Sequence, residues 1–332
     1  MTVVLLFASF GLVLGGALLF TNAVEWAGHQ LGLGTGAVGS ILAAVATALP
    51  ESTIPIVAIL KGTDETEQVA IGAIVGAPFM LATIAMMLVG IAAHGFSGRR
   101  PQDERIRAHE ATLRRDLLFF LAIFGVALAL GIAGVRVLNY SVAPILVLVY
   151  FAYVAWTLRR GGEKQERTEL SPLYFDLTRH DPPAKWQVAP QLAVAIAAII
   201  LGAHLFVEQL TAIAEAIGIA PLVLALVIAP LATELPEKVN SFIWMREGKD
   251  ALALGNITGA MVFQSSLPVA VGLAFTSWKF GTETILASAF ALAGGAVAMW
   301  AGLRAERFDR RSIAAWAGMF TAFVAYVAVS AG

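Results

Sequence analysis

The amino-acid sequence predicts an all-α membrane protein of ten transmembrane helices, built as two inverted repeats of five helices each. The chain has 332 residues, of which 58% are hydrophobic and 14% are charged, and its mean hydropathy is +0.79. This composition is too apolar for a soluble protein with a polar surface. The chain also contains ten apolar runs long enough to cross a hydrocarbon core about 30 Å thick, and a motif with proline and glutamate occurs once in each half.

The ten predicted helices follow one another with little intervening sequence. They begin near residues 3, 36, 68, 116, 141, 189, 220, 250, 280 and 312. Helices 1 to 5 therefore occupy residues 1–160, a polar cytoplasmic linker occupies residues 161–187, and helices 6 to 10 occupy residues 188–332. A second polar stretch covers Phe96 to Arg115. No Lys or Arg precedes the first apolar run at Val3, so we expect a retained helix and not a secretory signal peptide.

The basic residues are unevenly distributed between alternate loops. The loops that follow odd-numbered helices hold eighteen of the twenty-two Lys and Arg residues. The opposite face holds only Lys61, Arg136 and Lys279, and Lys238 falls within a predicted helix. Under the positive-inside rule, the side with eighteen basic residues is cytoplasmic. We therefore expect an integral protein of a prokaryotic plasma membrane, with both termini on the non-cytoplasmic side.

The two halves of the chain match each other at a fixed offset. A shift of 186 residues aligns Gly16 to Glu51 with Gly202 to Glu237, and 11 of these 36 positions are identical. A shift that is three residues shorter aligns Val69 to Ala77 with Leu252 to Ala260. Because each repeat has an odd number of helices, the second enters the membrane from the opposite side, as in many secondary transporters. Equivalent residues then surround a twofold axis near the membrane midplane, so we expect Glu51 and Glu237 to face each other.

The aligned segments end in related motifs, Thr47-Ala-Leu-Pro-Glu51 and Thr233-Glu-Leu-Pro-Glu237. An ionised side chain at mid-bilayer costs about 2.5 to 3.5 kcal/mol on insertion scales, so two matching glutamates predict a functional centre. Each threonine lies four residues before its glutamate and shares a helix face with it, although its hydroxyl group can equally bond back to the preceding turn. The prolines lack an N–H group and free the backbone carbonyls of Ala46 and Ala232, whose oxygen atoms can coordinate a cation.

Each motif is followed by a pair of glycines four residues apart, at Gly72 and Gly76 and again at Gly255 and Gly259. This spacing commonly allows close helix packing and nothing more. Close packing would also let the second of these helices bring Gln264 or Asn256 to the carboxylates. Both interpretations fit the sequence.

Together these features resemble the calcium:cation antiporter superfamily, which includes the sodium/calcium exchangers. The resemblance rests on the paired Thr-x-Leu-Pro-Glu motifs, each followed by a Gly-x-x-x-Gly helix, and it covers essentially all ten predicted helices. It implies that Glu51 and Glu237 are the central ligands of a transported cation. It also implies that Thr47 and Thr233 lie beside them.

The sequence departs from the family pattern at several positions. The family's serine before Leu-Pro-Glu is replaced by Ala48 and Glu234, and its Gly-Ser-Asn motif is replaced by Gly76-Ala77-Pro78 and Gly259-Ala260-Met261. The resemblance implies that the missing hydroxyl groups help to bind sodium, so we expect H⁺ rather than Na⁺ as the counter-ion. Three neighbouring carboxylates in a low-dielectric site cannot all stay ionised once the cation leaves. We therefore predict Glu234 as a ligand or proton carrier, and Gln264 as a further ligand.

The sequence thus predicts a secondary active antiporter that exchanges Ca²⁺ or a related divalent cation against H⁺. Carboxylate, hydroxyl and carbonyl oxygens can supply the six to eight ligands that Ca²⁺ takes. The expected partners are inorganic cations and the lipid bilayer, with no resident cofactor and no nucleic acid. The alternatives are a monovalent cation/proton exchanger, a uniporter or channel, and an intramembrane enzyme that uses the carboxylate pair. The sequence has no nucleotide-binding loop, no activated nucleophile and no cysteine for a thiolate metal site.

Overall fold

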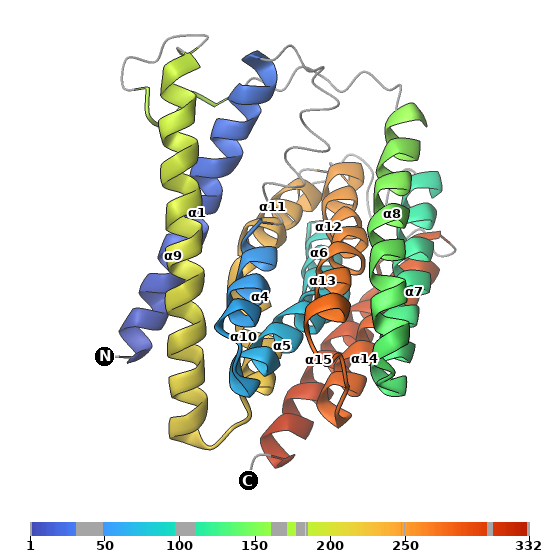
Figure 1. Ribbon diagram of the computed structural model, residues 1–332. Helices are drawn as coiled ribbons and strands as arrows, with labels where there is room; N and C mark the ends of the chain where they lie inside the picture. Colours follow the sequence, from blue (N-terminus) through green and yellow to red (C-terminus); the bar gives the residue numbers. More distant parts are fainter. Residues whose placement is uncertain are drawn as a thin grey trace.

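The computed structural model describes residues 2–30, 49–96, 110–160, 171–176, 183, 185–246, 248, 250–303 and 308–330. All regular elements in this part of the chain are helices, as Figure 1 shows. They are α1 (Thr2–Gln30), α4 (Leu49–Lys61), α5 (Asp64–Met80), the π-helical turn η2 (Leu81–Ala85), α6 (Met86–Gly95), α7 (Glu110–Ala133), α8 (Arg136–Arg160), α9 (Lys185–Ile217), α10 (Pro221–Thr233), α11 (Leu235–Arg246), α12 (Asp250–Gln264), α13 (Leu267–Phe275), α14 (Thr282–Leu303) and α15 (Arg310–Ser330).

Eight helical segments within the described residues are long and apolar enough to cross a membrane. They coincide with eight of the ten predicted helices. The predicted helix near residue 220 is divided into α10 and α11, and only Pro221–Leu231 forms a short apolar helix there. Most of the predicted helix near residue 36 lies outside the described residues, and α4 follows that stretch. The all-helical membrane architecture is therefore confirmed.

Two helices begin within the predicted polar stretches. α7 begins at Glu110, so Arg114 and Arg115 belong to this helix. The guanidinium group of Arg115 lies 2.8 Å from the buried carboxylate of Asp116, which gives both charges a partner near the start of the helix. α9 likewise begins at Lys185, within the predicted linker.

α1 and α9 cross as a pair on one side of the molecule (Figure 1). A Cβ atom added to Gly16 would lie 2.9 Å from the backbone oxygen of Ala195, and one added to Gly202 would lie 2.9 Å from that of Ser9. Glycine is required at both positions because the two backbones approach so closely. Ser9 and Ala195 are separated by the same 186 residues as Gly16 and Gly202, so the contact is reciprocal.

The helices that carry the two motifs pack around α5. A Cβ atom on Gly72 would lie 2.5 Å from the backbone oxygen of Leu222, and one on Gly76 would lie 2.2 Å from that of Leu226. In the first half of the chain, the glycine spacing therefore serves close packing of α5 against α10. This contact holds α10 in place just before the chain reaches the second motif.

The described part of the predicted linker, residues 171–176, is attached to the ends of α1 and α9. The indole Nε1 of Trp26 donates a hydrogen bond of 2.9 Å to the backbone oxygen of Ser171. The backbone N–H of Phe175 donates a hydrogen bond of 2.9 Å to Oε1 of Gln191. The chain that joins α8 to α9 is thus bound to the α1/α9 pair.

Candidate cation-binding site

The helix break predicted from proline is present in the second half of the chain. α10 ends at Thr233, α11 begins at Leu235, and Glu234 lies in a turn between them. Pro236 has no N–H group, so the usual helical bond to the carbonyl of Ala232 cannot form. Helical bonding resumes where the N–H of Lys238 donates to the backbone oxygen of Glu234 at 3.1 Å. The break lies inside the protein.

Glu51 and Glu237 take the same position in two different helices. Each is the third residue of a helix that begins Leu-Pro-Glu, α4 in the first half and α11 in the second. Both are buried, with 7% and 5% of their surface exposed. A helix dipole stabilises a carboxylate in the first turn, which favours a buried acid at this position. The charges of Glu237, Glu234 and Lys238 act on the carboxyl group of Glu51, so these residues lie in the same region of the protein.

Four buried oxygen atoms of the predicted site residues have no hydrogen-bond partner among the described residues. They are Oε2 of Glu51, Oε1 of Glu234, Oε2 of Glu237 and Oε1 of Gln264. A buried acceptor without a donor costs about 1 to 3 kcal/mol, and such atoms are rare in folded proteins. A cation or protons bound at the carboxylates would satisfy the three glutamate oxygen atoms.

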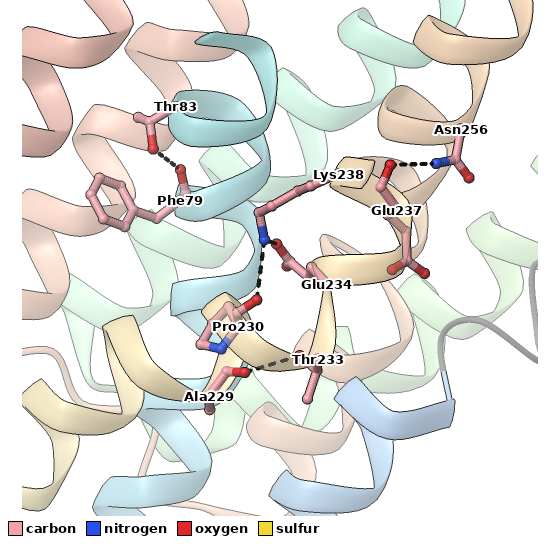
Figure 2. A network of polar contacts seen from close by, with 9 residues as sticks. All are labelled: Phe79, Thr83, Ala229, Pro230, Thr233, Glu234, Glu237, Lys238 and Asn256. Carbon is pink, nitrogen blue, oxygen red and sulfur yellow. Dashed lines mark hydrogen bonds and ion pairs between the residues drawn. The ribbon is translucent and has the colours of Figure 1, made fainter. Parts of the chain in front are cut away.

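Lys238 forms a buried ion pair that the sequence interpretation missed. Its Nζ lies 2.6 Å from Oε2 of Glu234 and donates a second hydrogen bond of 3.1 Å to the backbone oxygen of Pro230. Figure 2 shows that Lys238 and Glu237 point to different sides of α11, as their sequence separation predicts. The available signal was the four-residue spacing from Glu234 to Lys238, which is the favourable order for an ion pair on a helix.

The polar residues around Glu237 are held mainly through backbone groups. The hydroxyl group of Thr233 donates to the backbone oxygen of Ala229 at 3.1 Å, which is the simpler of the two roles considered for it. Its oxygen lone pairs can still face a cation. Nδ2 of Asn256 donates to the backbone oxygen of Glu237 at 3.2 Å and to Oγ of Ser241 at 3.0 Å, so α12 reaches the site helix but not the carboxylate itself.

Several predicted site residues are not close enough to act together in this conformation or cannot be assessed. Among the described residues, no three acidic or histidine side chains are close enough to hold a metal ion. The side chain of Glu234 is turned to Lys238 (Figure 2). Thr47 and the backbone carbonyl of Ala46, both predicted to bind the cation, lie outside the described residues. The site is therefore described from one half of the chain and from Glu51.

A further buried carboxylate, Asp116 of α7, was not among the predicted site residues because it follows the predicted polar stretch directly. It accepts hydrogen bonds from the hydroxyl groups of Tyr153 and Thr258 and pairs with Arg115. The Thr258 bond, 2.9 Å long, joins α7 to the second glycine-spaced helix. Both carboxylate oxygens accept hydrogen bonds, so Asp116 connects α7 to α8 and α12.

The fold and the site define a helical membrane protein with two buried glutamates, each in the first turn of a helix that begins Leu-Pro-Glu. The sodium/calcium exchanger protein family model matches residues 1–159 and 188–331. The chain belongs to this family, which confirms the resemblance inferred from the paired motifs. The relatives and structures named below are antiporters and ion exchangers and not enzymes, which favours transport over the intramembrane enzyme considered above.

Individual relatives and structures agree with this assignment. The chain is 34% identical to the putative antiporter CaxA of Alkalimonas amylolytica over 91 residues. This alignment covers 27% of this chain and 28% of CaxA. The alignments with the first two curated relatives span 51% and 28% of those proteins. The fold is similar to that of the H⁺/Ca²⁺ exchanger CAX, with a TM-score of 0.76 at 18% identity over 98% of this chain and 81% of that one. It is also similar to that of the sodium-calcium exchanger NCX_Mj, with a TM-score of 0.60 at 18% identity over 98% and 97% of the two chains.

Proposed function

We propose that this protein is a secondary active antiporter for Ca²⁺ or a related divalent cation, with Glu51 and Glu237 as the central ligands. The observation that supports this most strongly is the matched position of the two glutamates. Each is buried in the first turn of a proline-started helix, one from each half of the chain, and each has an unpartnered oxygen atom among the described residues. Buried carboxylates in a membrane protein are costly unless they bind a partner.

Ten transmembrane helices in two inverted repeats, residues 1–160 and 188–332 around a cytoplasmic linker at 161–187, are part of this proposal. The two ranges matched by the family model fall on either side of that linker. The reciprocal contact of Gly16 and Gly202 is the kind of contact that a local twofold axis produces. In Figure 1, α1 begins and α15 ends at the lower end of the molecule, whereas α8 ends and α9 begins at the upper end. These positions support an even number of crossings with both termini on the same side of the membrane, and the distribution of basic residues favours the non-cytoplasmic side.

The proposed ligand set consists of oxygen atoms only. The carboxylates of Glu51 and Glu237 provide the charge, and the hydroxyl groups of Thr47 and Thr233 and the carbonyls of Ala46 and Ala232 complete a ring of hard ligands. Gln264 adds an amide oxygen that is buried without a donor among the described residues. Ca²⁺ takes six to eight such oxygens in a flexible arrangement, whereas Mg²⁺ demands a tighter octahedron.

H⁺ is the proposed counter-ion. Two buried carboxylates that face the same site repel each other when the cation leaves, and protons relieve this repulsion. The small residues Ala77 and Ala260 leave no hydroxyl groups where the family pattern implies sodium ligands. The structural neighbour CAX exchanges H⁺ and Ca²⁺, which supports the same choice. Sodium, the counter-ion in the name of NCX_Mj, is the alternative.

Alternating access is proposed to occur by movement of α1 and α9 across the helices that carry the site. The α1/α9 pair packs on α4, α5 and α10 through a mixed apolar surface, in which the small Ala58, Ala73 and Ala203 lie beside larger side chains such as Ile54 and Phe206. Apolar side chains make no directional bonds across this contact, which is compatible with movement of one rigid body over the other. The helix break at Glu234 would stay in place during this movement.

Flux measurements in proteoliposomes test the proposed function. Purified protein would be reconstituted into proteoliposomes. Uptake of Ca²⁺, Sr²⁺, Mg²⁺, Na⁺ and K⁺ would then be measured for each ion separately, under imposed H⁺ or Na⁺ gradients. We expect uptake of Ca²⁺ and Sr²⁺ that requires an opposing ion gradient. Flux of monovalent cations alone would favour a monovalent cation/proton exchanger, and divalent flux without any counter-ion would indicate a uniporter or channel.

A further inference from the structure

The Lys238 ammonium group occupies a position that would suit a bound cation. It lies at the C-terminal end of α10, where the helix dipole is negative, and contacts a carboxylate oxygen of Glu234 at 2.6 Å and the backbone oxygen of Pro230 at 3.1 Å. A carboxylate together with a carbonyl at the end of a broken helix is the ligand set that membrane transporters offer to a monovalent cation. Here the chain supplies that positive charge itself.

Both members of this ion pair are deeply buried. The side chains of Glu234 and Lys238 are each 2% exposed, so neither charge is screened by water. Removing two charges from water is expensive, and a buried pair often stabilises a fold no better than two apolar residues. Stability alone therefore gives little reason for this pair to lie inside a membrane protein.

The pair is present in only one of the two repeats, and both members are missing from the other. The residues that align with Glu234 and Lys238 at the 186-residue offset are Ala48 and Ser52. The first repeat thus lacks the extra carboxylate and also lacks the ammonium group. This pattern indicates that Glu234 and Lys238 form one unit.

The charge of Lys238 acts directly on the proposed ligands. Glu51 and Glu237 both lie within electrostatic range of Lys238, and Glu51 also lies within range of Glu234. With all groups ionised, three carboxylates and one ammonium group leave a net charge of about −2 at the site. One divalent cation would neutralise this charge, whereas three free carboxylates would require a further monovalent cation.

We propose that Lys238 is a built-in cation of the transport site. Its ammonium group binds Oε2 of Glu234 and neutralises the charge of that carboxylate, so that Glu51 and Glu237 carry the net negative charge offered to the transported cation. In this assignment Glu234 is the partner of the lysine and not a ligand of the transported ion. The inference rests on the proposed function, because it assumes that Glu51 and Glu237 bind the cation.

Three variants test the pair by transport: Glu234→Gln, Lys238→Met and the double variant Glu234→Gln/Lys238→Met. Glu234→Gln alone leaves the buried ammonium group unpaired, and we expect Ca²⁺ flux to fall at least about tenfold. The double variant removes both charges together, and we expect flux to return to within about threefold of the unaltered protein. Glu237→Gln serves as the inactive reference and the exposed Lys279→Met as the matched lysine control.

Ion-dependent thermal unfolding in detergent tests the same pair without transport. In Lys238→Met the freed Glu234 should accept a monovalent cation, so Na⁺ or K⁺ should raise the unfolding temperature relative to choline. The unaltered protein should respond to Ca²⁺ and not to Na⁺ or K⁺. If it shows neither divalent flux nor stabilisation by any divalent ion, the proposed function fails, while the monovalent response of Lys238→Met still decides the role of the lysine.

Three results would overturn the assignment of Lys238. A folded double variant as inactive as Glu237→Gln would show that Glu234 is itself a ligand. Full flux in Glu234→Gln alone would show that the lysine does not need this partner. If the double variant does not fold, the absence of any monovalent response in Lys238→Met would overturn the proposal.

Discussion

At the scale of single residues, the site depends on two glutamates that begin equivalent helices. Glu51→Gln and Glu237→Gln keep the shape of each side chain and remove its charge. We expect each change to lower divalent flux by more than about 100-fold, because changes even to residues behind metal ligands cost 10 to 100-fold. The measurement is flux into proteoliposomes at matched protein amounts, with Glu215→Gln, an exposed acid of α9, as the control. Near-normal flux in either site variant would remove that glutamate from the ligand set.

Gln264 allows a structural role to be separated from a binding role. Its Oε1 is buried without a partner among the described residues, so Gln264→Leu removes an acceptor whose burial is unfavourable. Unfolding free energy should stay the same or rise by about 1 kcal/mol. If Gln264 is a ligand, the apparent affinity for Ca²⁺ should fall by about tenfold in the same variant. Unchanged affinity together with raised stability would assign Gln264 to the fold alone.

The sequence predicted these residues unequally. Glu51 and Glu237 were found because the proline-glutamate motif repeats in register. The one-residue separation of Glu237 and Lys238 puts their side chains on different sides of the helix, as Figure 2 shows, but the ion pair of Lys238 with Glu234 was not predicted. Glu234 was predicted as a ligand or proton carrier, and its contact with Lys238 depends on how the chain turns at the helix break.

At the scale of helices, the crossing of α1 and α9 depends on Gly16 and Gly202. In Gly16→Ala the new methyl group would lie 2.9 Å from the backbone oxygen of Ala195. We expect a loss of about 1 to 3 kcal/mol of unfolding free energy from this overpacking. Gly15→Ala is the matched control, since its Cβ atom meets nothing within 4 Å, and alanine there should be neutral or stabilise the helix by up to about 1 kcal/mol. Thermal unfolding in detergent would measure both, and equal effects would contradict the close crossing.

Helix positions were predicted better than helix ends. The break between α10 and α11 follows from the covalent chemistry of Pro236, so it could be inferred from the sequence. The start of α7 at Glu110 could not, because hydrophobicity marks the apolar part of a helix and not its polar first turns. Arg114 and Arg115 therefore lie in the helix, although they precede the apolar run.

At the scale of the whole molecule, the proposed inverted repeat fixes which loops face the cytoplasm. Single cysteines can be introduced freely because the chain has none. Arg159 and Lys279 are both exposed. Three proposed membrane crossings separate them along the chain, so the proposal places them on opposite sides of the membrane. We expect a membrane-impermeant maleimide to label Arg159→Cys only from the cytoplasm, and Lys279→Cys and Gly332→Cys only from outside. Labelling of Arg159→Cys and Lys279→Cys from the same face would contradict the inverted topology.

The membrane class and the family were predictable because they depend on composition and on a repeated motif, and both survive distant divergence. The arrangement of α1 and α9 as a separate pair was not predictable in detail, since it depends on which glycines meet. The offset of 186 residues nevertheless marked Gly16 and Gly202 as equivalent, and the structure places both at one crossing.

The most direct test of the proposed exchange measures divalent entry and proton exit in the same proteoliposomes without Na⁺. We expect a proton gradient to drive Ca²⁺ uptake, with about two protons leaving for each Ca²⁺ that enters, because Glu51 and Glu237 are the two carboxylates free to carry them. Both fluxes should vanish together in Glu51→Gln and in Glu237→Gln. Uptake driven by a sodium gradient alone, with no response to pH, would contradict proton exchange at this carboxylate pair.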